Sequence, residues 1–183
     1  MMKKILAMIA GVAALSCGQT QAEPSEPANG GKVLVAYFSA TGTTENAAKK
    51  LAEATGGTLH AITPKVPYSA ADLDWRDHKS RCYAEMHDPA SRPEISGTVA
   101  NMTTYDTIYI GFPIWWDTYP SLIATFIEAH QLQGKTLIPF ATSGGSGIGA
   151  SVANLKKNYP TLTWKRGLLL NGVDVQQIRG MLK

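Results

Sequence analysis

The stretch KVLVAYFSATGTTENAAKKLAEA, residues 32–54, decides the fold of the chain around it. An apolar, β-prone run at 33–38 leads into a turn of small and hydroxylated residues at 39–44, and helical spacing begins after the turn. This order predicts a buried strand, a turn and a helix. The first backbone N–H groups of such a helix have no intrahelical acceptor. Together with the positive end of the helix dipole, they form an anion site.

The side chains of the turn favour a phosphate monoester as the anion. Ser39, Thr41, Thr43 and Thr44 add hydroxyl donors to the backbone amides. The turn contains no lysine, so it is not the G-x-x-x-x-G-K-[ST] nucleotide loop, and the G-x-G-x-x-G fingerprint is also absent. The alternative is an ordinary capped turn, in which Thr43 or Thr44 is the helix N-cap.

Residues 1–22 have the pattern of an export signal. Lys3 and Lys4 precede an apolar run at 5–15 that is too short to span a bilayer. The chain would be cleaved after Ala22, or, because residues 14–17 resemble a lipobox, Cys17 would be lipidated and become the new N-terminus. The residues leave both outcomes open. Either outcome predicts an exported protein, periplasmic or anchored to a membrane through Cys17.

Beyond the leader, residues 23–31 predict a flexible tether because they are rich in Pro, Gly and Ser, and residues 32–183 suffice for one domain. The leader holds two of the 17 basic residues and none of the 14 acidic ones, so its loss leaves a net charge of +1. A nearly neutral chain gives no reason to expect nucleic acid as a partner. Since Cys17 lies in the leader, Cys82 is expected to be a partly buried thiol without an intramolecular partner.

Strands and helices alternate along the rest of the chain. Further strands are expected at residues 58–63, 107–112, 136–141 and 163–170, with helical spacing between them and a short last helix near the end. Alternation of this kind predicts an α/β fold, a doubly wound parallel sheet of five strands.

Two later strands end in unusual loops. The third strand runs into PIWWDTYP, residues 113–120, which places three large aromatic side chains within five residues. That much ring surface is costly to leave in water, so a flat ligand is expected to cover it, unless both indoles plug the sheet edge. The fourth strand ends in TSGGSGIG, residues 142–149, whose glycines let the backbone approach a ligand closely, unless the loop is a flexible connector.

Residues 64–106 are polar and lack a clean period. A short helix is expected around residues 72–85, followed by an irregular segment. Because the interval exceeds an ordinary crossover, part of it is expected to form a lid near the ligand. Cys82, His87 and Asp88 do not specify a metal geometry, and no metal site is predicted.

These motifs resemble those of a bacterial flavodoxin-like family that binds FMN. The similarity lies in the first turn, which fits [ST]-x-T-G-x-T, and in GFPIWW, PSLIATFIE, GKTLIPF and TSGGSGIG, and it covers residues 32–171. It implies a flavodoxin-like sheet of strand order 2-1-3-4-5. The ligand would lie beyond the carboxyl ends of strands 1 and 3, an arrangement that flavodoxin with FMN itself exemplifies.

The resemblance also implies which residues bind the cofactor. The first turn would bind the phosphate, and the isoalloxazine would lie between the second and third loops. These residues are Ser39, Thr41, Gly42, Thr43 and Thr44 at the phosphate, Pro113, Ile114, Trp115 and Trp116 on one side of the ring, and Thr142, Ser143, Gly144 and Gly145 on the other.

Three functions are compatible with this interpretation. The first is an FMN-binding electron-transfer protein that serves a redox partner protein or a quinone. The second is an FMN-dependent NAD(P)H or quinone oxidoreductase, and the third is a module that binds a phosphorylated ligand without redox chemistry. No catalytic acid, base or nucleophile is evident in the motifs, which favours a carrier whose chemistry belongs to the cofactor.

Overall fold

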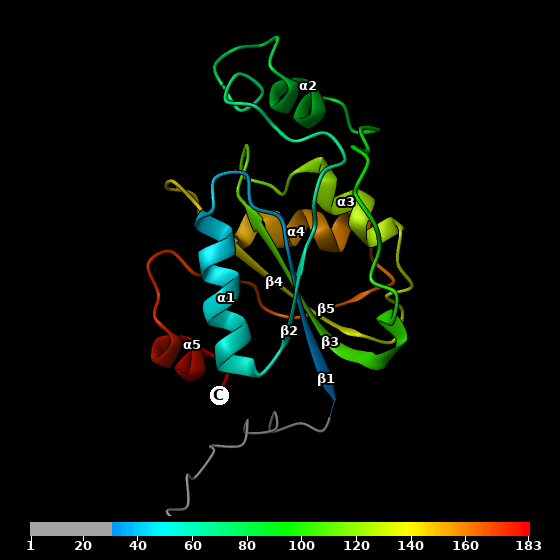
Figure 1. The fold of residues 1–183 in the computed structure, drawn as a ribbon, viewed down its shortest axis with the longest axis vertical. Coiled ribbons are helices and arrows are strands. Elements are labelled where there is room, and N and C mark those ends of the chain that lie inside the picture. Colours follow the sequence, from blue (N-terminus) through cyan, green and yellow to red (C-terminus); the bar gives the residue numbers. More distant parts are fainter. Residues whose placement is uncertain (1–30) are drawn as a thin grey trace, which may run out of the picture.

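The computed structural model describes residues 31–183. The expected leader at 1–22, its Cys17 and nearly all of the tether at 23–31 lie outside these residues. The described chain alternates strands and helices around one sheet (Figure 1). The elements are β1 (Lys32–Tyr37), α1 (Thr43–Thr55), β2 (Thr58–Ala61), α2 (Arg81–His87), η1 (Met102–Thr104), β3 (Tyr105–Pro113), α3 (Ser121–Glu128), β4 (Thr136–Thr142), α4 (Gly149–Asn158), β5 (Thr163–Trp164), β6 (Leu168–Leu169) and α5 (Val175–Met181).

The strands form one parallel sheet of order β2-β1-β3-β4-β5, and the short strand β6 also pairs with β4. This topology confirms the predicted doubly wound α/β sheet and its strand order. Parallel strands end at a common edge, so the loops that follow β1, β3 and β4 lie side by side at the carboxyl edge. In Figure 1 this edge faces upward, and the segment that carries α2 stands beyond it.

Both faces of the sheet are covered, which explains why β1 is apolar after Lys32. Val35 and Tyr37 pack with α1 and α5 on one face. Leu34 and Ala36 point to the other face and pack with the apolar side of α3. The core therefore lies on both sides of the sheet, and only the loops at its edges are free to contact a ligand.

Helix α1 begins and ends at glycines. Its N-cap is Gly42, at φ 87°, and no side chain caps the first turn. The alternative that Thr43 or Thr44 is the N-cap is therefore wrong, because the left-handed conformation at this position favours a residue without Cβ. The helix ends at Gly56, whose φ of 67° is in the left-handed region that glycine adopts readily at helix C-termini.

The predicted fifth strand, residues 163–170, is interrupted. Leu137 pairs with Trp164 and Phe140 with Leu168, so this strand uses one residue more than β4 between the two pairings. The extra residue forms a bulge that brings Gly167 close to α4, where a Cβ would lie 2.7 Å from Cγ2 of Val152. One predicted strand is thus two short ones, β5 and β6.

The predicted helix around residues 72–85 exists, but it begins later, at Arg81. Ser80 is its N-cap and accepts a hydrogen bond from the Tyr83 N–H at 3.3 Å. Asp72 instead fixes a turn, because its Oδ2 accepts from the Ser69 N–H at 2.8 Å. Within residues 31–183, none of the helices has the length and apolar composition needed to cross a bilayer.

Candidate functional site

Two contacts bring the three expected binding loops together at the carboxyl edge. The hydroxyls of Thr44 and Thr142 lie 2.8 Å apart and join the first turn to the end of β4. The rings of Phe38 and Trp115 meet edge to face with their centroids 5.7 Å apart, which joins the end of β1 to the loop after β3. The indoles and the hydroxyl-rich turn therefore lie on the same rim of the sheet.

The first turn presents an open set of donors. Ser39 Oγ accepts from the Gly42 N–H at 3.1 Å, and the Asn46 N–H donates to the Gly42 carbonyl at 3.0 Å. Because no side chain caps α1, the amides of Thr43, Thr44 and Glu45 remain for a ligand. A hydroxyl and several amides at the start of a helix suit a phosphate oxygen.

The four predicted hydroxyls of this turn do not share one environment. Thr41 and Thr43 are exposed at the rim, and Ser39 is half-buried. Thr44 is only 1% exposed and its partner Thr142 only 4%, so these two side chains are turned toward each other inside the protein. They hold the loops together, and only their backbone amides can face a ligand.

The loop after β3 is a strained two-residue hairpin. Trp115 and Thr118 exchange both backbone hydrogen bonds, at 3.0 and 2.9 Å, and the residues between them have positive φ, 44° at Trp116 and 60° at Asp117. Two consecutive positive φ values are typical of a type I′ turn, for which Asn-Gly is the preferred pair. A bulky side chain such as Trp116 is a true outlier there, and strain of this kind is concentrated at functional sites.

The hairpin is held by contacts from two other segments. Ser146 Oγ donates to the Asp117 carboxylate, which ties the third loop to the second. From α4, Ser151 Oγ donates to the Asp117 carbonyl at 3.2 Å, and Asn154 Nδ2 donates to Thr118 Oγ1 at 3.0 Å. These bonds stabilise a turn conformation that the sequence alone disfavours.

The two tryptophans have different environments. Trp115 is half-buried and packs edge to face against Phe38 and Tyr68, both at 5.7 Å. Trp116 is 39% exposed, and its ring meets the edges of Tyr83 and His87 from α2. The alternative that both indoles plug the sheet edge therefore describes Trp115 in part and does not describe Trp116.

The third loop is anchored by a residue that the sequence motifs missed. Asn171 Oδ1 accepts from the Ser143 N–H at 3.0 Å, and its Nδ2 donates to the Ser143 carbonyl. Beyond this anchor, a Cβ on Gly144 or Gly145 would find no atom within 4 Å. Asn171 follows the expected fifth strand and so lies at the same edge of the sheet as the other loops. Its place in the sequence could therefore have indicated that it lies near the site.

A cavity of about 550 Å³ joins the second and third loops. Its walls come from Ile114, the two indoles, Asp117 and residues 143–146, and from three residues of the segment before β3. These three are Leu73, Trp75 and Cys82. The segment expected to form a lid thus contributes a wall of this cavity, and Cys82 is fully buried rather than partly buried.

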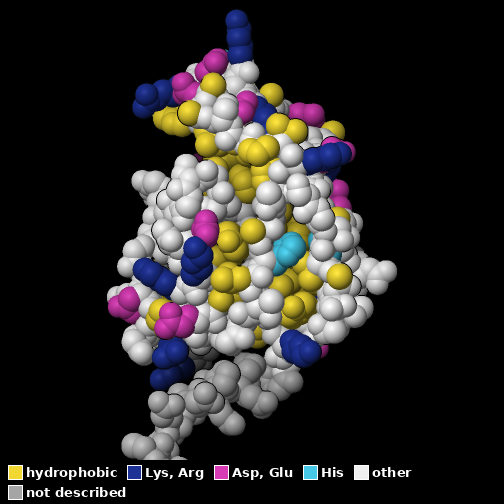
Figure 2. All heavy atoms as spheres, in the orientation of Figure 1, with side chains coloured by type: hydrophobic (Ala, Val, Ile, Leu, Met, Phe, Trp, Pro, Cys, Tyr) yellow, Lys and Arg dark blue, Asp and Glu magenta, His cyan; other side chains and the backbone are white. Residues whose placement is uncertain are grey.

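A latch holds α2 against the site. Arg81 Nε donates to Glu85 Oε1 at 2.6 Å, Tyr68 donates to the other oxygen of Glu85, and the Arg81 guanidinium lies 4.1 Å from the centre of the Tyr68 ring. Burial and the nearby Glu85 carboxylate raise the pKa of Tyr68, so its phenol stays protonated and donates. Figure 2 shows apolar side chains gathered where this segment meets the body of the molecule.

The chemistry of the cavity comes from aromatic rings, hydroxyls and amides. Across the described part of the chain, no group of three or more His, Cys, Asp or Glu side chains could hold a metal ion. The indoles and the glycine loop face the same cavity, and the start of α1 has no side-chain cap. The edge therefore suits a planar molecule that carries a phosphate.

Comparisons with known proteins identify the family of the chain. Residues 32–180 match the family model described as flavodoxin. A candidate flavoprotein from Bacteroides eggerthii is 58% identical, with a TM-score of 0.81 over 82% of this chain and 95% of that one. Another from Bacteroides uniformis is 52% identical, with a TM-score of 0.81 over 84% and 98%.

A more distant structure has the same fold. It is a flavoprotein in complex with FMN from Lactobacillus acidophilus, 21% identical, with a TM-score of 0.65 over 78% of this chain and 95% of that one. No curated protein matches the chain. The family match over residues 32–180 and the two Bacteroides structures show that the chain belongs to the flavodoxin family.

Proposed function

We propose that the chain binds FMN at the carboxyl edge of the sheet and serves as an electron-transfer protein. The observation that carries the proposal is the convergence of three loops, with open helix amides at one end and an indole-lined cavity at the other. This arrangement matches the two parts of FMN, a phosphate and a flat ring. The Lactobacillus acidophilus flavoprotein in complex with FMN supports the choice of ligand.

The phosphate would be bound by the turn at 39–44. The amides of Thr43, Thr44 and Glu45 point from the first turn of α1, and the hydroxyls of Thr41 and Thr43 lie open beside them. The turn contains no lysine or arginine, so neutral donors and the helix dipole would stabilise the charge. Ser39 would contribute mainly by fixing Gly42.

The ring would lie in the cavity between the indoles and the glycine loop. FMN supplies the capacity to accept and give one or two electrons. Trp116 would pack against the ring, Trp115, Pro113 and Ile114 would border it, and the amides of Gly144 and Gly145 would donate to its edge. Leu73 and Trp75 would exclude water from the outer side.

Aromatic stacking alone would tune the potential only slightly. A stacked pair contributes about 0.5–1.5 kcal/mol beyond area burial. A tenfold change in a one-electron equilibrium corresponds to about 59 mV. If the stacking energy differed by its full amount between two oxidation states of the flavin, the potential would therefore shift by only tens of millivolts. Larger shifts would have to come from hydrogen bonds, and the loop at 143–146 offers the donors.

The residue pattern at 1–22, which resembles an export signal, supports a site of action outside the cytoplasm. The protein would act in the periplasm, or at a membrane if Cys17 carries a lipid anchor. Its electron partner would be another redox protein or a quinone. A chain with almost no net charge beyond the leader would meet either partner without strong electrostatic steering.

The test is flavin binding followed by turnover. The purified full chain, titrated with FMN, is expected to quench flavin fluorescence with one site per chain and to exchange electrons with a chemical reductant. Steady-state oxidation of NAD(P)H in the presence of a quinone is expected to be almost absent. Rapid turnover would assign the protein to the oxidoreductases instead, and failure to bind FMN would reject the flavin proposal altogether.

A further inference from the structure

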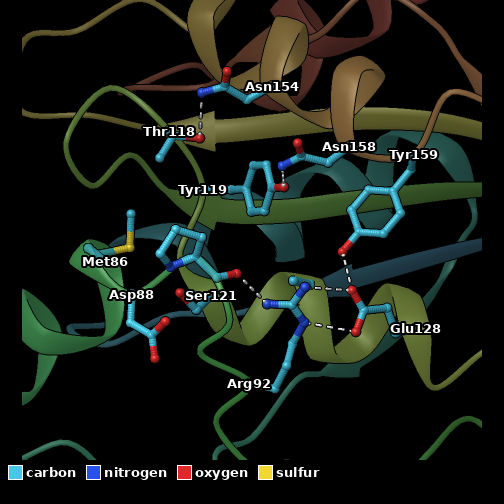
Figure 3. Close-up of a pocket in the computed structure, with 12 residues that line it drawn as sticks. Met86, Asp88, Arg92, Thr118, Tyr119, Ser121, Glu128, Asn154, Asn158 and Tyr159 are labelled. Carbon is cyan, nitrogen blue, oxygen red and sulfur yellow. Dashed lines mark hydrogen bonds and ion pairs between the residues drawn. The ribbon is translucent and has the colours of Figure 1, made fainter.

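A second cavity adjoins the strained hairpin at Thr118. It measures about 590 Å³, within the range of small-molecule sites. Its walls come from three parts of the fold: the end of α2 with the segment after it, helix α3 with the loop before it, and helix α4 with the residue that follows it (Figure 3). None of the expected flavin-binding residues lines it, so it is not part of the edge site.

Arg92 and Glu128, which line this cavity, satisfy each other. Arg92 Nε and Nη2 donate to the two oxygens of Glu128 at 2.8 and 2.9 Å, and Nη1 donates to the carbonyls of Pro89 and Ser91. Tyr159 adds a third hydrogen bond to Glu128 at 2.8 Å. The bond from Arg92 is the main reason that the pKa of Glu128 lies below its usual value, so the carboxylate stays charged at neutral pH. Neither Arg92 nor Glu128 is available as an anchor for an ionic ligand.

Several neutral polar groups of the cavity are also fixed in place. Asn158 Nδ2 donates to Tyr119 Oη at 2.7 Å, and Asn154 Nδ2 donates to Thr118 Oγ1 at 3.0 Å. These bonds orient both amides and leave their oxygens as acceptors. Burial raises the pKa of Tyr119, so its hydroxyl keeps a hydrogen to donate. Figure 3 shows Asn154 and Asn158 on one side of the cavity and the Arg92–Glu128 pair on the other.

Apolar surface lies between these polar groups. Met86, Pro89 and Ala124 line the same cavity, and the half-buried ring of Tyr159 borders it. Asp88 stands exposed at the rim, where Oδ1 accepts from the Ala90 N–H at 2.9 Å. A ligand that matches these walls has several hydroxyls on a carbon frame and carries no charge.

We propose that this cavity binds a neutral monosaccharide. Asn154, Asn158 and Tyr119 would exchange hydrogen bonds with its hydroxyls, because each offers a donor or an acceptor that the protein leaves unused. Met86 and Pro89 would cover its C–H surface. Charged sugars would bind more weakly, because Arg92 and Glu128 are already paired with each other. The remaining charge, on Asp88, is exposed at the rim, where water screens it, so it would repay little of the cost of desolvating a charged sugar.

The experiment measures sugar binding to the full chain by saturation-transfer NMR and calorimetry. The probes are D-glucose, D-galactose and D-mannose, with D-glucosamine and D-glucuronate as charged analogues of the same ring. At least one neutral sugar is expected to bind, and both charged analogues are expected to bind at least tenfold more weakly. Failure of all three neutral sugars, or tighter binding of either charged analogue, would overturn the proposal.

Two variants locate the site. Asn154→Leu with Asn158→Leu is expected to weaken sugar binding at least tenfold. Asn101→Leu is the matched control, because Asn101 is exposed and its side chain makes no capping bond. Circular dichroism and thermal unfolding of each variant show whether it is folded. Equal sugar affinity in the double variant and the control would place the sugar elsewhere and overturn the assignment. Because the site shares no flavin-binding residue, its failure would leave the flavin proposal intact.

Discussion

The hydroxyls of the turn at 39–44 show how little residue type alone says about a side chain's role. Thr41, Thr43 and Thr44 are equivalent by chemistry, and the sequence predicts all of them at the phosphate. The structure separates them, because Thr44 is buried against Thr142 whereas Thr41 and Thr43 stay at the rim. A contact between residues 98 positions apart has no signature in local spacing, so the sequence could not predict this pair.

The separation leads to a prediction about FMN and riboflavin. Replacing Thr41 and Thr43 with Val removes the two open hydroxyls and leaves the Thr44–Thr142 pair unchanged. Each hydrogen bond to a charged group contributes about 1.5–3 kcal/mol, so FMN affinity is expected to fall at least tenfold for each residue replaced. Riboflavin, which has no phosphate, is expected to bind almost as before. Fluorescence titration with both flavins measures the difference.

A control variant isolates the phosphate contact. Thr98 is exposed in another segment, and Thr98→Val removes the same group there. This variant is expected to bind both flavins normally. Equal losses of FMN and riboflavin in the Thr41 and Thr43 variants would contradict the phosphate assignment, because only FMN carries the group in question.

At the scale of elements, the hairpin at 115–118 depends on Asp117. Its φ of 60° is costly for most residues, while Asp and Asn are several-fold enriched there. Its carboxylate also accepts from Ser146 and so joins the second loop to the third. Asp117→Ala removes both features, and Asp117→Asn keeps both because Asn retains an oxygen acceptor and tolerates the left-handed conformation.

The two variants are therefore expected to differ. Asp117→Ala should lower the free energy of unfolding by about 2–3 kcal/mol, the sum of a left-handed penalty of about 1–2 kcal/mol and a lost hydrogen bond of about 1 kcal/mol. It should also weaken FMN, because the position of Trp116 is no longer fixed. Asp117→Asn should change both quantities little. Denaturant unfolding and flavin titration make the comparison, and an Asn variant as weak as the Ala variant would show that charge, not turn geometry, matters.

Elements with one strong local signal could be predicted, and elements shaped by neighbours could not. The order of strand, turn and helix at 32–54 was predictable because apolar run, glycine and helical spacing agree. The split of the fifth strand was not, since it depends on the closeness of Gly167 to Val152 in α4. The helix expected around residues 72–85 begins only at Arg81, because the Asp72 carboxylate accepts from the Ser69 N–H and holds a turn there.

The sequence indicated that a segment before β3 would lie near the ligand, but it did not indicate which residues of that segment would line the cavity. The length of the interval before β3 indicated an insertion near the ligand. Which side chains reach the cavity depends on the latch between Tyr68, Arg81 and Glu85, and these residues are dispersed in the sequence. Leu73, Trp75 and Cys82 were therefore recognised only from the cavity they line.

At the scale of the whole molecule, the outer strand β2 links stability to pH. His60 lies on β2 beside Phe126 of α3, with the ring centroids 6.0 Å apart. Burial, and secondarily the nearby His130, lower the pKa of His60 below its usual 6.5. The folded chain thus keeps His60 neutral at a pH where the unfolded chain already binds a proton.

Stability is therefore expected to fall as the pH drops through about 6.5, because the proton binds only after unfolding. Replacing His60 with Gln removes the titrating group and should flatten this part of the profile. Denaturant unfolding of both proteins at about pH 7.5 and pH 5.5 measures this loss of stability. The interval does not include the titration of Glu128, whose lowered pKa makes a contribution to stability that is lost only below its usual value of 4.5. If the variant lost as much stability as the wild type over this interval, the pH dependence would arise elsewhere in the chain, and the contact between β2 and α3 would not be its source.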